Sequence, residues 1–177
     1  MGSYLGVVDS VTNIPHEADH GDPFAINAGM NDAWMNAGAD NQGIFITVFP
    51  DLKIIFLAWF TFDTVPPSQG TSSTIESSSK STIATFGSDD QRWTTAVGSY
   101  SGTTAQLKAE LTSGGLFNSS EPLPAQQLEY GTINLDFKNC NEAMVDFNFP
   151  SVGEAGQFTI SRALAKNAAL CEALNAE

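Results

Sequence analysis

Aromatic, acidic and basic residues that could bind a ligand occur at two places in the sequence. One is the end of the apolar segment 54–62, and the other is the start of the segment that follows the polar insertion at 64–90. Trp59 and Asp63 lie near the end of the first segment, and Arg92 and Trp93 open the second. Because successive side chains of a strand alternate between its two faces, Trp59 and Asp63 are expected to share a face. Aromatic faces stack on sugars or flat apolar molecules, and a guanidinium can hold a carboxylate through two parallel hydrogen bonds. The predicted ligand-binding residues are therefore Trp34, Trp59, Asp63, Arg92 and Trp93.

The same residues also have a purely structural interpretation. Large aromatic side chains are common core fillers in β-domains. An ion pair between Arg92 and Asp63 would fix the register of two neighbouring strands without touching any ligand. The sequence leaves both interpretations open.

Nucleophilic, redox and metal chemistry have little support in the sequence. The two histidines, His16 and His20, precede every predicted strand, so neither is expected to be held rigidly beside a nucleophile. Cys140 and Cys171 are too far apart in the chain for a redox or zinc-binding pattern. No glycine-rich phosphate loop precedes a predicted helix. We therefore predict no catalytic residue, no metal site and no cofactor.

Composition and charge exclude several classes of partner. The chain has 177 residues, of which 42% are hydrophobic, enough for one domain with a core. It carries 7 Lys and Arg against 20 Asp and Glu, a formal net charge of -13, and such a surface repels phosphates. The most apolar run, residues 54–62, is too short for a membrane helix. We predict neither a nucleic-acid partner nor membrane insertion.

Two features favour an exported protein. The chain is acidic, poor in lysine and rich in Ser, Thr, Gly and Asn, which is typical of exported bacterial proteins. Cys140 and Cys171 could form one disulfide around a loop of about 30 residues, worth roughly 3–4 kcal/mol, or remain two buried thiols. Residues 1–3 resemble a start added by cloning, and no signal peptide is present in this sequence. We predict a secreted or periplasmic location.

The pattern along the chain predicts one β-domain. Residues 1–25 lack apolar periodicity and are expected to form a flexible acidic arm, and residues 64–90 form a Ser-rich insertion within a single domain at 26–177. Alternating apolar and polar residues predict eight strands, followed by a helix at 163–174: the strands are 32–36, 44–49, 53–63, 92–100, 104–111, 131–139, 143–149 and 157–162. The fold class is all-β, an antiparallel meander closed as a barrel or a barrel-like sandwich, with a short C-terminal helix.

The alternation also predicts which side chains face inward. In segment 104–111 every second residue from Ala105 to Leu111 is apolar and the residues between them are polar. Segment 53–63 is apolar on both sides near its middle, so it should be central or covered on both faces. All three indole rings are expected to point toward the inside of the sheet.

Six short motifs resemble a poorly characterised family of exported bacterial β-domains, found alone or attached to secreted hydrolases and lipoproteins. The motifs are Trp34-x-Asn36, Gly43-x-Phe45, Trp59-Phe60-Thr61-Phe62-Asp63, Gln91-Arg92-Trp93, Gly114-Gly115-x-Phe117 and Asn139-Cys140-Asn141. The resemblance spans residues 27–174, with departures at Met35, at Asn139 and in the Ser-rich insertion. It implies export and β-architecture, and no activity. A looser likeness, Trp34 opening the first strand of a meander, links the chain to avidin-type and lipocalin-type barrels by fold alone.

These observations predict a secreted, non-catalytic binding or accessory module for a carbohydrate or a small apolar ligand. The first alternative is an interaction protein whose strand edges and long insertion mediate either self-association into a homo-oligomer or docking to a cell-surface partner. The second is a hydrolase that uses two carboxylates held across a cleft. The candidate acids for that reaction are Asp63, Asp89, Asp90 and Asp32.

Overall fold

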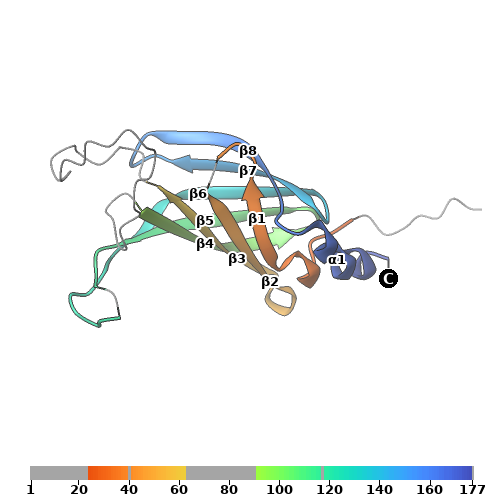
Figure 1. The fold of residues 1–177 in the computed structure, drawn as a ribbon, viewed down its shortest axis with the longest axis horizontal. Coiled ribbons are helices and arrows are strands. Elements are labelled where there is room, and N and C mark those ends of the chain that lie inside the picture. The colour runs from red at the N-terminus through yellow and green to blue at the C-terminus, as the bar shows by residue number, and fades with distance from the viewer. Residues whose placement is uncertain (1–23, 40, 63–90, 117, 177) are drawn as a thin grey trace, which may run out of the picture.

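The chain folds into a closed barrel of eight antiparallel strands, each hydrogen-bonded to the next, with the last strand closing on the first (Figure 1). The structure is a computed structural model that describes residues 24–39, 41–62, 91–116 and 118–176, with Gln91 and Arg92 described by their backbone only. The strands are β1 (Asp32–Asn36), β2 (Gly43–Phe49), β3 (Ile54–Phe62), β4 (Gln91–Ser101), β5 (Thr104–Ser113), β6 (Ala125–Asn139), β7 (Glu142–Phe149) and β8 (Glu154–Arg162). The predicted all-β barrel is confirmed.

Two predicted boundaries are corrected. β6 begins at Ala125, inside the segment 112–130, which separates two predicted strands and was expected to be a loop. Residues 125–129 are exposed on both sides of the strand, so they carry no alternation of apolar and polar residues to reveal it. The predicted C-terminal helix is a 3-10 turn, η3 (Ala165–Ala168), followed by a single short helix, α1 (Ala169–Leu174).

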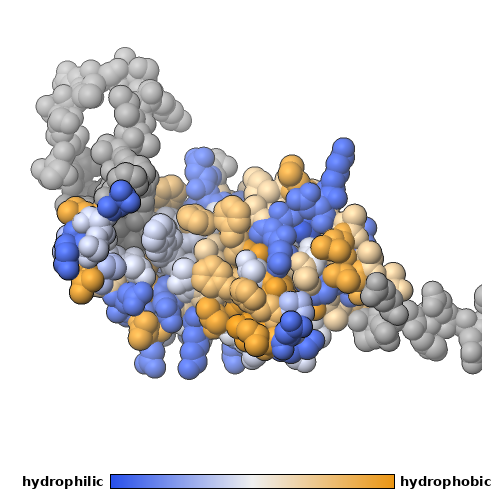
Figure 2. All heavy atoms as spheres, turned by 90° about the horizontal axis from the view of Figure 1, so that it is seen from below, coloured by the Kyte–Doolittle hydropathy of each residue, from blue (hydrophilic) through white to orange (hydrophobic). Residues whose placement is uncertain are grey.

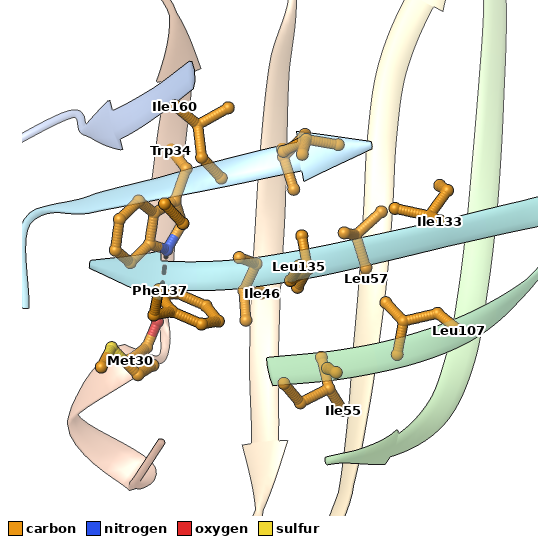
Figure 3. Close-up of a cluster of buried hydrophobic side chains, with 14 of the residues drawn as sticks. Met30, Trp34, Ile46, Ile55, Leu57, Leu107, Ile133, Leu135, Phe137 and Ile160 are labelled. Carbon is orange, nitrogen blue, oxygen red and sulfur yellow. Dashed lines mark hydrogen bonds between the residues drawn. The ribbon is translucent and has the colours of Figure 1, made fainter. Parts of the chain in front are cut away.

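Side chains fill the interior of the barrel (Figure 3). Trp34, Phe137 and Leu57 are each at most 1% exposed, and the rings of Trp34 and Phe137 meet edge to face with centroids 5.5 Å apart. The indole N–H of Trp34 donates a hydrogen bond to the Met30 carbonyl at 3.3 Å. Such close packing of large apolar groups is the main stabilising contribution in a domain of this size.

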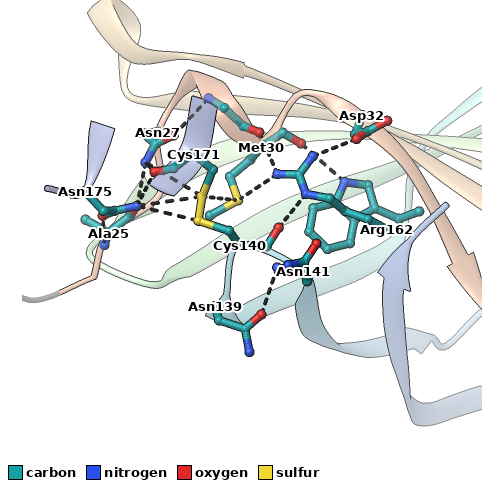
Figure 4. The surroundings of a disulfide bond; sticks show 12 residues. Ala25, Asn27, Met30, Asp32, Asn139, Cys140, Asn141, Arg162, Cys171 and Asn175 are labelled. Atoms are coloured by element: carbon teal, nitrogen blue, oxygen red, sulfur yellow. Dashed lines mark hydrogen bonds and ion pairs between the residues drawn. A yellow bond between two sulfur atoms is a disulfide. The ribbon is translucent and has the colours of Figure 1, made fainter. Parts of the chain in front are cut away.

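One end of the barrel is closed by η1 (Ala28–Met30), α1 and a disulfide between Cys140 and Cys171, which confirms the predicted bridge (Figure 4). The α1 helix packs against η1 so closely that a methyl group on Gly29 would lie 2.2 Å from the Cys171 nitrogen. Ala25 donates its backbone N–H to the Asn175 side chain at 2.8 Å. Residues 24 and 25, predicted as part of the arm, therefore contact the domain. The rest of the predicted arm, residues 1–23, and the insertion at 64–90 lie outside the described residues.

The other end of the barrel carries the connections β1–β2, β3–β4, β5–β6 and β7–β8. Inside this end, Trp59 packs against a cluster of phenylalanines. Its ring centroid lies 5.1 Å from Phe158, 5.4 Å from Phe147 and 6.1 Å from Phe149. The two ends of the barrel are thus stabilised differently, one by polar and covalent links and the other by aromatic packing.

Candidate functional site

The structure separates the three tryptophans that were predicted to share a ligand site. Trp34 and Trp59 are 1% and 7% exposed and are part of the core. Trp93 is 55% exposed on the outer surface, so the prediction that all three indoles face inward is wrong for Trp93. The side chains of β4 that face inward include Thr94, Ala96 and Tyr100, and strand alternation places Trp93 on the opposite face.

The polar half of the predicted site remains a prediction. Asp63 lies outside the described residues, and only the backbone of Arg92 is described. The register places Arg92 opposite Thr61 at the end of the β3–β4 pair, two residues beyond Trp59 along β3. The Thr61 hydroxyl donates a hydrogen bond to the Gln42 side chain at 2.6 Å, which links β3 to the loop before β2.

Arg162 and Asp32 form a buried ion pair that the sequence did not suggest. The Arg162 side chain is 1% exposed and donates hydrogen bonds to the Asp32 carboxylate at 2.7 Å and the Gly29 carbonyl at 2.6 Å. It also donates to the Cys140 carbonyl, and its guanidinium lies 4.8 Å from the centre of the Trp34 ring. Three segments far apart in the chain therefore meet at one cation (Figure 4).

The electrostatics of Asp32 follow from these contacts. Burial raises the pKa of Asp32, but hydrogen bonds from Arg162, the Ala33 N–H and Asn167 lower it by more, so the net pKa is below its usual value. Asp32 is ionised at neutral pH and engaged in a structural pair. The other acids named for a carboxylate hydrolase, at positions 63, 89 and 90, lie outside the described residues.

A concavity of about 520 Å³ lies on the outside of the barrel, over β4 to β8. It runs over a row of polar side chains that the strand register aligns across five strands. Ser99 pairs with Gln106, Gln106 with Asn134, Asn134 with Asp146, and Asp146 with Gln157. We call these five residues the polar row. Directly paired residues of antiparallel strands hold their side chains about 5 Å apart, so the row is a continuous strip of hydrogen-bonding groups.

Two members of the polar row are fixed to each other, and two others have unused hydrogen-bonding groups. Asn134 donates its side-chain N–H to Asp146 at 3.0 Å. Within the described part of the chain, neither Gln106 nor Gln157 makes a side-chain hydrogen bond. Met144, on the outer face of β7 beside the row, adds apolar contact surface to the concavity. The alternation in segment 104–111 predicted that Gln106 faces outward, but the alignment of the five residues depends on the strand register.

The described residues offer no alternative centre for metal chemistry. Among them, no group of three or more His, Cys, Asp and Glu side chains is close enough together to hold a metal ion. His16 and His20 lie outside the described residues. In the same part of the chain, no helix has the length and apolar character needed to cross a membrane.

Comparisons with protein-family models, with curated proteins and with solved structures find no match to this chain. The resemblance to exported bacterial β-domains therefore stays a prediction from the motifs. The fold and its disulfide are established by the structure itself.

Proposed function

We propose that the protein is an exported, non-catalytic binding module that holds a neutral carbohydrate over the polar row. The observation that carries the proposal is the alignment of amide and carboxylate side chains beneath a concavity of about 520 Å³. Amide groups offer both donors and acceptors, which match the hydroxyl groups of a sugar. The volume is in the range of small-molecule sites in proteins.

Fixed geometry and charge support a neutral sugar as the ligand. The hydrogen bond between Asn134 and Asp146 holds both side chains in place before a ligand arrives, which lowers the entropy lost on binding. Asp136 and Asp146 both line the concavity, and the chain has a net charge of -13, so sulfated or acidic glycans are repelled.

The packed core disfavours the other predicted ligand class, a small apolar molecule held inside the barrel. Trp34, Leu57 and Phe137 occupy that space and are almost fully buried. A ligand there would have to displace core side chains, at the cost of the contacts that stabilise the barrel.

The experiment that tests the proposal is titration of a panel of neutral and acidic oligosaccharides by calorimetry. We expect a neutral member to bind, and Asn134→Ala to weaken it about 5- to 10-fold, the effect of losing one hydrogen bond together with the hold on Asp146. The matched control is Asn148→Ala. Asn148 is an exposed asparagine on the outer face of β7, outside the concavity, so its loss should leave the affinity unchanged. Equal affinities for the wild type and Asn134→Ala, or binding confined to acidic glycans, would contradict the proposal.

The alternative function, self-association, is favoured by a separate observation. The outer face of β1 to β4 exposes large apolar side chains, Trp93 among them, and meets the polar row only at Ser99 on β4.

A further inference from the structure

The outer face of β1 to β4 is apolar and, among its described side chains, carries no charge. Strand alternation assigns residues from all four strands to this outer face. Its exposed large side chains, which we call the aromatic face, are Met35, Phe45, Phe49, Phe56, Phe60, Phe62, Trp93 and Val97. Between them lie small or neutral residues, among them Ala33, Thr47, Ala58 and Thr95.

The strand register joins these side chains into one surface. Phe60 pairs directly with Trp93, and Phe56 pairs with Val97. The ring of Phe45 meets that of Phe60 edge to face at 5.7 Å. Figure 2 shows hydrophobic residues grouped over the middle of one side of the molecule, with hydrophilic residues around them. The patch is continuous across β2, β3 and β4.

The patch is too large for an ordinary monomer surface. Its eight side chains are each 36% to 55% exposed, which corresponds to roughly 700 Å² if a fully exposed large side chain offers about 200 Å². The largest apolar patch of a typical monomer covers about 300–600 Å². A standard interface buries about 800 Å² on each partner, which is close to this area.

The net charge of the chain and the lack of charge on the aromatic face favour a second copy of the chain as the partner. Two copies of a chain with net charge -13 repel each other wherever acidic surfaces meet, so they can approach closely only through surfaces without charge. An uncharged apolar face is also complementary to itself, which is the requirement of a two-fold symmetric contact. On the β5 side the face ends at Lys108 and Glu110, which pair with Val97 and Thr95 and supply a polar rim. We propose that the aromatic face pairs with the same face of a second copy to form a dimer.

The dimer leaves most of each polar row, from Asn134 on β6 to Gln157 on β8, accessible. In a closed barrel of eight strands, β2 and β3 lie opposite β6 and β7. Joining two barrels through β1 to β4 therefore turns the part of each polar row on β6 to β8 away from the partner, whereas Ser99 on β4 lies at the edge of the contact, beside Val97. This consequence, unlike the dimer itself, rests on the proposed function: the dimer would carry two carbohydrate sites and bind a polymer with higher avidity than a monomer.

The test measures mass without any glycan, so it is independent of the proposed function. Light scattering during gel filtration should give the wild type a mass of twice 18.8 kDa at a concentration of about 100 µM. Phe60→Glu places a charge in the centre of the face and should raise the dissociation constant at least about 100-fold. The matched control is Leu128→Glu, which changes a leucine that is 58% exposed on β6, away from the face, and should remain a dimer.

Acrylamide quenching of tryptophan fluorescence supplies a second measurement that needs no variant. Trp34 and Trp59 are buried in either state, so Trp93 dominates the quenching. We expect quenching to increase on dilution of the wild type as Trp93 becomes accessible, and to be high at all concentrations in Phe60→Glu. Circular dichroism tests whether Phe60→Glu folds. If Phe60→Glu is unfolded, Trp93→Gln replaces it in the mass measurement.

Two results would overturn the proposal. One is a wild type that is monomeric at about 100 µM with Trp93 fully quenched, which would assign the face to a different partner. The other is a dimer that persists in folded Phe60→Glu. Failure of every glycan to bind would change neither measurement, so the two proposals fail separately.

Discussion

Replacing Arg162 by methionine should lower the free energy of unfolding by about 3–5 kcal/mol. Methionine keeps most of the volume of the arginine stem, so the change removes mainly the guanidinium and its hydrogen bonds. The guanidinium is buried and bonds to the Asp32 carboxylate and to the carbonyls of Gly29 and Cys140. The variant leaves all three acceptors without their donor at the closed end of the barrel.

The magnitude follows from the burial of these groups. A buried polar group that loses its partner costs about 1–3 kcal/mol, and a buried carboxylate without its counter-charge costs more. The loss of the guanidinium stacked on Trp34 at 4.8 Å adds a smaller amount. For a chain of this length, about 3–5 kcal/mol corresponds to a fall in Tm of roughly 10 °C.

Urea unfolding of four proteins tests the prediction: wild type, Arg162→Met, Asp32→Asn and the double variant. If the ion pair is the main interaction, the double variant should be more stable than the sum of the two single effects implies, because neither partner is then left charged and alone. The coupling between the two sites should exceed about 1 kcal/mol.

The pH dependence of the free energy of unfolding tests the same ion pair. The pKa of Asp32 is lower in the folded state than in the unfolded chain, where an aspartate has a pKa of about 3.9. The ion pair therefore contributes its full stability above that pH and loses it as the pH falls through the folded pKa. Asp32→Asn should lack this part of the acid destabilisation. A cost below about 1 kcal/mol for Arg162→Met, or additive single effects, would refute the structural role assigned to the pair.

Two further perturbations test the packing around this framework. Reduction of the Cys140–Cys171 disulfide, or replacement of both cysteines by alanine, should lower the free energy of unfolding by roughly 3–4 kcal/mol, and an equal Tm with and without reductant would contradict this. Gly98→Ala should cost about 3 kcal/mol, because a methyl group there would lie 1.9 Å from the Gln106 carbonyl oxygen and force β4 away from β5. The neighbouring exposed Ser99→Ala should cost less than about 0.5 kcal/mol in the same urea titration, and equal costs would contradict the close approach of the two strands.

Much of the barrel could be predicted because most of its strands have apolar side chains on one face and polar side chains on the other. In β5 the inward residues Ala105, Leu107 and Ala109 alternate with Gln106 and Lys108, and the structure buries the first three. The disulfide was predictable as well, since the chain has only two cysteines and both lie near predicted element ends. Local patterns of this kind report burial directly.

The position of Trp93 could not be predicted, because β4 has no such contrast. In its first half the inward residues Thr94 and Ala96 are smaller than the outward residues Trp93 and Val97. The space inside the barrel beside this part of β4 is already filled by large residues of the two neighbouring strands, Leu57 on β3 and Leu107 on β5, and Gly98 lies against the backbone of β5. The side chains of the neighbouring strands therefore leave room for only small inward residues in this part of β4.

Arg162 and the polar row were missed for a related reason. Arg162 follows Phe158 and Ile160 on the inward face of β8, and a cation at that position signals a buried partner, but the partners come from distant segments. The polar row exists only once four strand registers are fixed. Features that depend on register are not visible in any one segment.

The apolar character of both faces of β3 has one explanation in the structure. The sequence predicts that such a strand is central or covered on both faces, and β3 is indeed hydrogen-bonded on both edges, to β2 and β4. Yet Phe56, Phe60 and Phe62 are 36% to 45% exposed in the single chain. Exposed aromatic side chains across several adjacent strands invite association, which proteins prevent with charges when it is not used. The aromatic face lacks charges on its described side chains, whereas the outer face of β5 to β8 carries Lys108, Asp136 and Asp146. The two halves of the barrel thus differ in the way expected if one contacts a second copy and the other faces water and a ligand.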